Sequence, residues 1–416
     1  MLRTVTPTTR AVGLVAASGL IVTGLAGAAL ANNVNTTPIR DVKGTNTALS
    51  QPIGLTRDAS GKSYVSDFTN DSVSVFGKTA NGDVGPQRTI KGPNTLLDGP
   101  ESMAVDDNGF LYVANVVAQK VTEYAPGASG NVAPANSFGT GGGAFALALD
   151  DSGRIYVGDA ANAIKVFGAN ATGGAPAPLR TISGANTQLS NVLGLVVDDH
   201  SGRVWAANGA GNSVLAFSPT ATGDEAPTRV IKGDQTGLSQ PRGIALDGAG
   251  RIYVTNSGSN VVSVFAPNAS GNVAPIRTLS GVATTLSQPW GVSVASGNVL
   301  SVVNVSGAAL ATYGPLFPAT KPGKPTDLQV AGARGATNRP ATWDDPASDG
   351  GADITGYHLV VKKGTHTVLT RNVGGATHKV VLKRSQLADG INKVFVSAKN
   401  AKGTGPAATR TFVVNK

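Results

Sequence analysis

The chain has 416 residues, which is long for a single domain, and it carries a formal net charge of +9 at pH 7. It contains no cysteine, so disulfides, thiolate catalysis and cysteine metal sites are excluded.

Residues 1–31 have the order of a secretory signal peptide. Arg3 and Arg10 precede an apolar run of Ala, Gly, Leu and Val that starts at Ala11, and the segment ends in the small-residue pattern Ala29-Leu30-Ala31. An uncleaved membrane anchor is the alternative, because the run is long enough to span a bilayer. We favour cleavage after Ala31, and no later stretch is apolar enough to span. The sequence therefore predicts an exported bacterial protein, secreted or associated with the cell envelope.

One unit repeats from about residue 38 to residue 313, and residues 241–281 are its clearest copy. Short apolar runs alternate with polar turns, and no apolar pattern recurs at helical spacing, which indicates strands. In this copy we expect antiparallel strands at 243–247, 251–255, 261–265 and 275–279. Four such strands in about 48 residues are typical of one β-propeller blade.

Six copies of the unit are present. The position that closes the first strand recurs every 44 to 49 residues, at Asp58, Asp106, Asp150, Asp198, Asp247 and Ala295. The third strand ends in an aromatic residue each time, at Phe76, Tyr124, Phe167, Phe217, Phe265 and Tyr313. The sequence thus predicts an all-β, six-bladed propeller over residues 32–317.

The fourth-strand motif P-x-R-T-I-x-G is out of step with the other three. Its first copy, PIRDVKG at 38–44, precedes the first blade, and no copy follows Tyr313. An open sheet edge would leave backbone N–H and C=O groups unpaired. We therefore expect residues 38–44 to pair with the last blade, at 289–313, and to close the ring.

A proline-rich stretch at 318–324 is predicted to be an extended, moderately stiff linker. Beyond it the 48-residue period is lost, and residues 325–416 alternate like about seven short strands. That size and rhythm are typical of an immunoglobulin-like β-sandwich.

Charge is spread unevenly between these regions. Residues 32–322 carry 18 Lys or Arg and 19 Asp or Glu, whereas the chain after Pro322 carries 14 and 6. A solvated face that keeps a small domain soluble is the simpler explanation. The functional one is adhesion to an anionic partner outside the cell, such as a cell-wall polymer, an acidic glycan or a membrane surface. Nucleic acid is not expected as a partner, because no basic run is interleaved with aromatic residues.

The recurring motifs P-x-G-I-A-L-D, G-R-I-Y-V-x-N, N-x-V-x-V-F and P-x-R-T-I resemble the NHL-repeat family of six-bladed propellers over about two thirds of the chain. The resemblance implies the fold and says little about function. That architecture includes extracellular sensor domains, protein and RNA binders, lactonases, amidating lyases and streptogramin lyases.

The C-terminal region resembles a fibronectin type III domain through Trp343-Asp-Asp-Pro346, Ile354-Thr-Gly-Tyr357 and Ala398-Lys-Asn400. The family's corner tyrosine falls on Asn392, so its usual hydrogen bond must be lost or replaced. In exported bacterial proteins the resemblance implies a spacer, often beside glycan-degrading enzymes.

In a propeller, the loops that enter the first strands and those between second and third strands share one face, around the channel mouth. The first set places one variable residue per copy in what we call the slots: Ile53, Glu101, Phe145, Leu193, Arg242 and Trp290. Two charged residues and a large aromatic one differ from the other, apolar slot residues and could line a ligand pocket: Glu101, Arg242 and Trp290. The alternative is that the residues at these surface positions differ without any functional role.

The second set of loops places an Asp or Asn at the end of each second strand: Asp67, Asn115, Asp159, Asn208, Asn256 and Asn304. Their oxygens could bind a cation or a polar ligand. They could equally accept backbone N–H groups and cap their own turns. We favour capping because all six copies carry the residue, whereas a functional site usually breaks symmetry.

Histidine argues against catalysis. The chain has four, of which His200 alone lies in the repeat region, at a turn expected on the face opposite the mouth. The resemblance implies that lyase relatives rely on histidine for metal binding or proton transfer. A lactonase-like metal site stays open, with Asp67, Glu101, Asp159 and Asn208 as conceivable ligands. The acidic stretches at 106–109 and 198–202 are expected to be hairpin turns rather than calcium sites.

The sequence favours an exported, non-catalytic propeller that presents a binding face to an extracellular protein, glycan or small molecule. Its basic C-terminal domain would serve as a spacer or attach it to the envelope. The alternative is a metal-assisted hydrolase or lyase, lactonase-like or acting on glycans, in the propeller mouth. The first function requires no cofactor, whereas the second would place a divalent cation in the channel.

Overall fold

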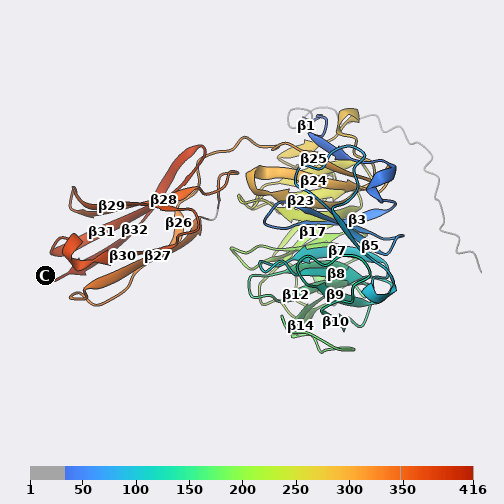
Figure 1. Ribbon diagram of the computed structural model, residues 1–416, viewed down its shortest axis with the longest axis horizontal. Helices are drawn as coiled ribbons and strands as arrows, with labels where there is room; N and C mark the ends of the chain where they lie inside the picture. The colour runs from blue at the N-terminus through green and yellow to red at the C-terminus, as the bar shows by residue number, and fades with distance from the viewer. Residues whose placement is uncertain (1–32, 347, 416) are drawn as a thin grey trace, which may run out of the picture. The chain divides into compact units, whose positions relative to one another are not determined.

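The computed structural model describes residues 33–346 and 348–415, and Figure 1 traces the chain from blue at its N-terminus to red at its C-terminus. This part of the chain is all-β, as the sequence predicts, with strands joined by turns and a few short 3-10 helices. The expected signal peptide at 1–31 lies outside the described residues. Within the described ranges, no helix is long and apolar enough to cross a membrane.

Six sheets account for the repeat region (Figure 1). In the first five, four consecutive strands pair antiparallel in chain order. Their strands are β3 (Pro52–Arg57), β4 (Ser63–Asp67), β5 (Ser72–Phe76) and β6 (Arg88–Lys91); β7 (Pro100–Val105), β8 (Leu111–Asn115), β9 (Lys120–Tyr124) and β10 (Asn136–Gly139); β11 (Ala144–Leu149), β12 (Ile155–Asp159), β13 (Ala163–Phe167) and β14 (Arg180–Ile182); β15 (Val192–Val197), β16 (Val204–Asn208), β17 (Ser213–Phe217) and β18 (Arg229–Lys232); and β19 (Pro241–Leu246), β20 (Ile252–Asn256), β21 (Val261–Phe265) and β22 (Arg277–Leu279). Four-stranded sheets of this order fit the blades of a propeller.

The sixth sheet takes its outer strand from the beginning of the chain. It contains β23 (Pro289–Ala295), β24 (Val299–Asn304), β25 (Ala309–Tyr313) and β2 (Arg40–Val42). Arg40 lies opposite Thr312 and Val42 opposite Leu310 in an antiparallel pair. The predicted pairing of residues 38–44 with the last sheet is therefore confirmed. A shorter strand, β1 (Asn33–Val34), adds to the fifth sheet in parallel beside β22.

The fourth strand of the fifth sheet is shorter than the sequence predicts. We expected it to start at Pro275, but β22 starts at Arg277. Proline has no backbone N–H to donate to a ladder, so pairing begins only after it, where the N–H of Ile276 donates to the carbonyl of Val264 at 2.8 Å.

Five short 3-10 helices precede first strands, and each ends in a buried threonine. In every case the threonine hydroxyl donates a hydrogen bond to the carbonyl of the glycine that begins the turn. They span Thr45–Thr47, Pro93–Thr95, Ala185–Thr187, Asp234–Thr236 and Val282–Thr284, and two further 3-10 helices span Ser296–Asn298 and Arg384–Gln386. The third sheet lacks such a helix because the glycine run at 139–143 replaces it.

Each of these sheets packs against a neighbour on both faces. Along β12, Ile155 and Val157 pack into a core shared with the second sheet, whereas Tyr156 packs into one shared with the fourth. This explains why the second strands read as continuous apolar runs instead of alternating. A further core joins Val42 and Leu310 of the sixth sheet to Val65 of the first. The sheets therefore follow one another around a closed ring.

The C-terminal residues form two more sheets. One contains β26 (Pro325–Val330), β27 (Asn338–Pro346) and β30 (Lys379–Lys383); the other contains β29 (His366–Gly374), β28 (Gly356–Lys363), β31 (Gly390–Asn400) and β32 (Gly403–Val414). Trp343 and Leu382 of the first sheet share a buried core with Leu359 and Val396 of the second. The two sheets are therefore held together by the alternate residues that face inward.

Asn392, where the sequence analysis expects a corner hydrogen bond to be lost or replaced, bonds to nearby backbone. Its side chain is fully buried, and its amide donates to the carbonyl of Ala388 at 2.7 Å and to that of Gly390 at 3.0 Å. The side-chain oxygen of Asn392, Oδ1, is buried without a hydrogen-bond partner among the described residues.

Candidate functional site

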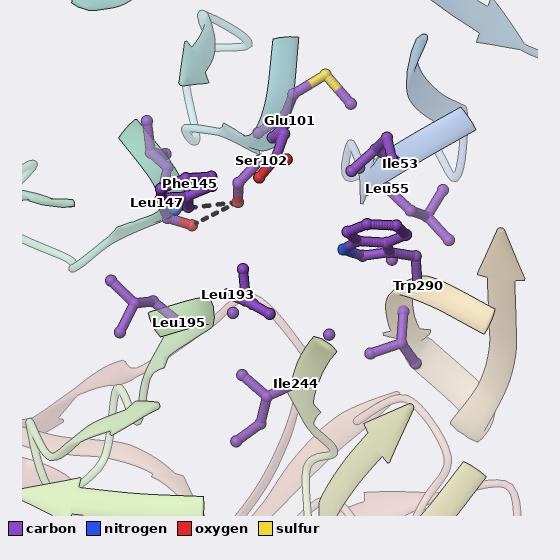
Figure 2. Close-up of a pocket in the computed structure, with 16 residues that line it drawn as sticks. Ile53, Leu55, Glu101, Ser102, Phe145, Leu147, Leu193, Leu195, Ile244 and Trp290 are labelled. Atoms are coloured by element: carbon purple, nitrogen blue, oxygen red, sulfur yellow. Dashed lines mark hydrogen bonds between the residues drawn. The ribbon is translucent and has the colours of Figure 1, made fainter. Parts of the chain in front are cut away.

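Five of the six slot residues meet around one cavity of about 70 Å³, which we call the mouth cavity (Figure 2). Its walls are mostly aliphatic and aromatic, and they include the slot residues Ile53, Glu101, Phe145, Leu193 and Trp290. The side chains come from the first strands of the sheets and project inward from several directions (Figure 2). The sixth slot residue, Arg242, lies against Trp290 instead of lining the cavity.

Close backbone approach between neighbouring first strands draws the slots together. A side chain on Gly54 would place its Cβ 1.9 Å from the carbonyl oxygen of Glu101, and one on Gly291 would lie 2.7 Å from that of Ile53. Only glycine permits such contact. Ser102 stands at the equivalent position in the second sheet, and its hydroxyl accepts a hydrogen bond from the Leu147 N–H at 3.0 Å (Figure 2).

Glu101 is the acidic side chain of the mouth cavity. It is only 7% exposed, and no described residue donates a hydrogen bond to its carboxyl group or pairs with it within 4.0 Å. Burial raises the pKa of Glu101 to about 8, and the charge of Arg242 opposes that rise only in part. A buried carboxyl group without a partner is costly, because nothing replaces the water it has lost.

Arg242 and Trp290 form a stacked pair at this end of the ring. The guanidinium carbon lies 4.1 Å from the centroid of the Trp290 ring, and Nε of Arg242 donates to the hydroxyl of Ser257 at 3.2 Å. Burial lowers the pKa of Arg242, and the charge of Glu101 opposes this. Stacking fixes the plane of the guanidinium, so its terminal N–H groups are oriented in advance for an acceptor.

The Asp and Asn residues at the ends of second strands brace loops. Asn115, Asn208, Asn256 and Asn304 are buried, and each side-chain oxygen accepts a backbone N–H from the loop before the first strand of its own sheet, at 2.5 to 3.2 Å. Asp67 does the same with the N–H of Ser50. These oxygens are therefore engaged with backbone and do not line the mouth cavity.

Asp159 braces its own turn in a different way. Its carboxylate accepts the N–H of Ala161 at 2.9 Å and that of Ala163 at 3.2 Å, and it pairs with Lys165 at 2.7 Å. The ammonium of Lys165 also donates to the carbonyl of Thr140, so a lysine spans the shortened glycine-rich loop.

The conceivable metal ligands do not fit a divalent cation. Asp67 and Asp159 belong to different sheets and each is hydrogen-bonded locally, while Glu101 lies in the mouth cavity. Across the described ranges, no group of three or more His, Asp or Glu side chains lies close enough to hold one ion.

The acidic stretches at the other end of the strands form turns. The Asp106 side chain accepts the N–H of Asn108 and of Phe110, and the Asp198 side chain accepts the N–H of His200. These are the contacts of hairpin turns, as the sequence predicts.

Two hydroxyl groups that support the slots were missed in the sequence. Ser66 donates to the carbonyl of Glu101 at 2.6 Å, and Thr255 donates to that of Trp290 at 2.5 Å. Both residues stand just before the Asp or Asn that ends a second strand, where the other four copies have Ala, Gly or Val. A hydroxyl residue at this position therefore marks the two slots that hold Glu101 and Trp290, and it is a sequence signal for them.

No protein-family model matches the chain. Among solved structures, it is similar to a streptogramin B lyase, at 14% identity over 66% of this chain and 96% of that one, with a TM-score of 0.45. It is also similar to the WD40 β-propeller domain of Doa1, at 12% identity over 66% and 96%, with a TM-score of 0.45. The extracellular domain assigned to a one-component system of B. thetaiotaomicron gives 10% identity over 92% and 59%, with a TM-score of 0.43. These values assign neither a family nor an activity to this chain.

Proposed function

We propose that the protein is an exported, non-catalytic binding module, built as a six-bladed propeller at 32–317 that presents its channel mouth to an extracellular ligand. The C-terminal residues 325–416, which resemble a fibronectin type III domain, attach the propeller to an anionic component of the cell envelope. The ring of six sheets and the basic excess after Pro322 support these two parts.

The observation that carries the proposal is the unpartnered carboxyl group of Glu101. It lies in an apolar cavity with a stacked Arg242–Trp290 pair near by. Structural carboxyl groups elsewhere in the ring, such as those of Asp67 and Asp159, are hydrogen-bonded. A group that lowers the stability of the fold and lacks a structural role points to a ligand that completes it.

The size of the mouth cavity favours binding over turnover. Pockets that enclose a small molecule measure roughly 300–1,000 Å³. A cavity of about 70 Å³ admits only a projecting polar group or a few water molecules. The ligand would therefore insert one hydrogen-bond donor towards Glu101, while the rest of it lies over Arg242 and Trp290.

Tryptophan fluorescence tests this proposal directly. Trp205 and Trp343 are buried, at 2% and 1% exposure, so a change of emission on adding a ligand reports mainly on the half-buried Trp290. We would screen glycans, peptides and small metabolites against the full chain, and repeat each titration with Glu101→Gln and Arg242→Gln. Both variants should weaken binding by about tenfold, as expected when a buried hydrogen bond to the ligand is lost.

Matched controls are Glu225→Gln and Arg334→Gln, which remove the same charges from exposed positions. Equal affinity in all four variants would refute a site at the mouth. If the ligand is chemically altered after incubation with the protein, the protein is an enzyme and the proposal of a non-catalytic binding module is wrong. A stoichiometric divalent metal in the purified protein would favour the hydrolase or lyase alternative.

A further inference from the structure

The four-stranded sheet of the C-terminal region, made of β29, β28, β31 and β32 (Figure 1), is basic throughout. Its strands carry six Lys or Arg and no Asp or Glu: Lys362, Lys363, Arg371, Lys393, Lys399 and Arg410. Alternate residues on one face of this sheet, such as Leu359 and Val396, fill the core. The remaining alternate residues form the outer face.

Two lysines stand directly opposite each other on that outer face. Lys362 of β28 pairs in register with Lys393 of β31. Their ammonium nitrogens lie 5.6 and 5.3 Å from the ring centroid of Phe395, so both cations share one aromatic ring. No described carboxylate lies within 4.0 Å of either ammonium. We call Lys362, Lys393 and Phe395 the lysine–phenylalanine platform.

Like charges directly opposite on neighbouring strands destabilise a sheet. The shared ring offsets this in part through cation–π attraction, which is small at exposed positions. The pair is therefore arranged as if an anion were to lie between the two ammonium groups. An anion there would convert a repulsion into two charge-assisted hydrogen bonds.

Hydroxyl groups extend the platform along the same rungs of the sheet. Lys393 lies opposite Thr411, Phe395 lies opposite Thr409, and both threonines are exposed. Phe395 itself is half-buried, so it presents a ring within a flat face and does not project from it. A flat aromatic ring with hydroxyls and cations beside it suits a sugar ring that carries a carboxylate.

We propose that the lysine–phenylalanine platform binds an anionic polysaccharide, with a sugar ring against Phe395 and a uronate carboxylate between Lys362 and Lys393. The inference rests on the envelope-attachment part of the proposed function and gives it a site and a ligand class. A bilayer is disfavoured because its insertion needs projecting apolar side chains. Single-stranded nucleic acid usually needs a series of stacking rings, and this face has one.

The test uses the full chain and two forms of one polymer. Polygalacturonate carries a carboxylate on each sugar, and its fully methyl-esterified form has the same backbone without the charge. We expect retention on immobilised polygalacturonate at low salt, and binding of the ester at least about tenfold weaker.

Matched variants locate the contact. Lys362→Gln combined with Lys393→Gln should weaken binding by about tenfold or more, since both charged hydrogen bonds are lost. Lys379→Gln combined with Lys383→Gln removes the same charge from β30 of the other sheet, and should change affinity by less than about twofold. Phe395→Leu keeps the charge and should still weaken binding. Thermal melts of every variant exclude unfolding.

Several outcomes would overturn the proposal. They are equal losses in the two lysine pairs, equal binding of the esterified polymer, or tighter binding of single-stranded DNA or of phosphatidylserine vesicles than of polygalacturonate. Tryptophan fluorescence reports on the mouth site and polymer retention reports on the platform, so a failure of one and a failure of the other give different results.

Discussion

At the scale of single residues, Glu101 and Asn392 bury polar groups in different ways. The amide nitrogen of Asn392 donates to two backbone carbonyls, while its Oδ1 has no hydrogen-bond partner among the described residues. Glu101 has no such partner among the described residues, and its pKa rises because the charged form is poorly solvated. The two hydrogen bonds of Asn392 offset part of the cost of its burial, whereas Glu101 lowers stability whenever it is ionised.

Glu101 should therefore make the free energy of unfolding depend on pH. The native state keeps the proton up to about pH 8, while an unfolded chain releases it near the ordinary glutamate pKa of 4.5. Between these values the native state binds more protons than the unfolded state, so stability falls as pH rises. We expect Glu101→Gln to remove a penalty on the order of 4 kcal/mol by pH 8.

The measurement is the Tm of wild type and variant from pH 4 to pH 9. The difference should widen in favour of Glu101→Gln as pH rises and then level off above about pH 8. Glu225→Gln, at an exposed position, should melt in parallel with wild type. Parallel melts for Glu101→Gln would mean that the carboxyl group is solvated or paired in solution.

Counting repeats predicts which residues occupy the slots, because each slot lies five residues before the position that closes the first strand. It does not predict that Arg242 stacks on Trp290, because that contact joins two different copies and depends on how neighbouring sheets tilt. The burial of Glu101 is likewise set by aliphatic side chains from several sheets. Local sequence around residue 101 carries no sign of it.

At the scale of elements, β2 has more influence than its three residues suggest. It supplies the outer strand of the sixth sheet, and Val42 packs in the core shared by the sixth and first sheets. The sequence predicts this pairing because the fourth-strand motif occurs once too early and is then missing at the end. The extra fourth-strand motif before the first sheet and the missing one after the last sheet can both be counted in the sequence without any knowledge of tertiary contacts.

Deletion of residues 32–44 should lower the Tm by several degrees, because it exposes the edge of β25 and removes Val42 from its core. The matched control is deletion of residues 32–36, which removes β1 but leaves β2 in place. The longer deletion should be clearly the more destabilising of the two when both are melted at one pH. Identical melts would show that β2 contributes nothing to closure.

At the scale of the whole molecule, charge is divided between the two regions. The repeat region is nearly neutral, and the C-terminal region is strongly basic. Composition reveals this division, but only the strand register reveals that Lys362 and Lys393 face each other. Register depends on which strands pair. The strands of the C-terminal region are similarly apolar, so the sequence does not show which of them are neighbours.

The division of charge predicts two different responses to salt. Binding of an anionic polymer should weaken steeply between about 50 and 500 mM NaCl, because the Debye length that screens exposed charges falls from roughly 14 Å to roughly 4 Å over this range. Binding at the mouth should change much less, because Glu101 and Arg242 are shielded from solvent there. Titrations of one preparation at both salt concentrations make the comparison, and equal slopes would contradict the separation of the two sites.

The pairing of β2 with β25 also sets an order of events during synthesis. Arg40–Val42 leaves the ribosome early, yet its partner at Ala309–Tyr313 appears only after nearly the whole repeat region has been translated, on the order of tens of seconds later. Until then every nascent chain holds one spare strand and one incomplete ring. The hairpin of β24 and β25 emerges last and completes the ring. A ribosome that stalls before Tyr313 therefore leaves β2 and the edge of the sixth sheet unpaired, and both could pair with strands of a neighbouring chain.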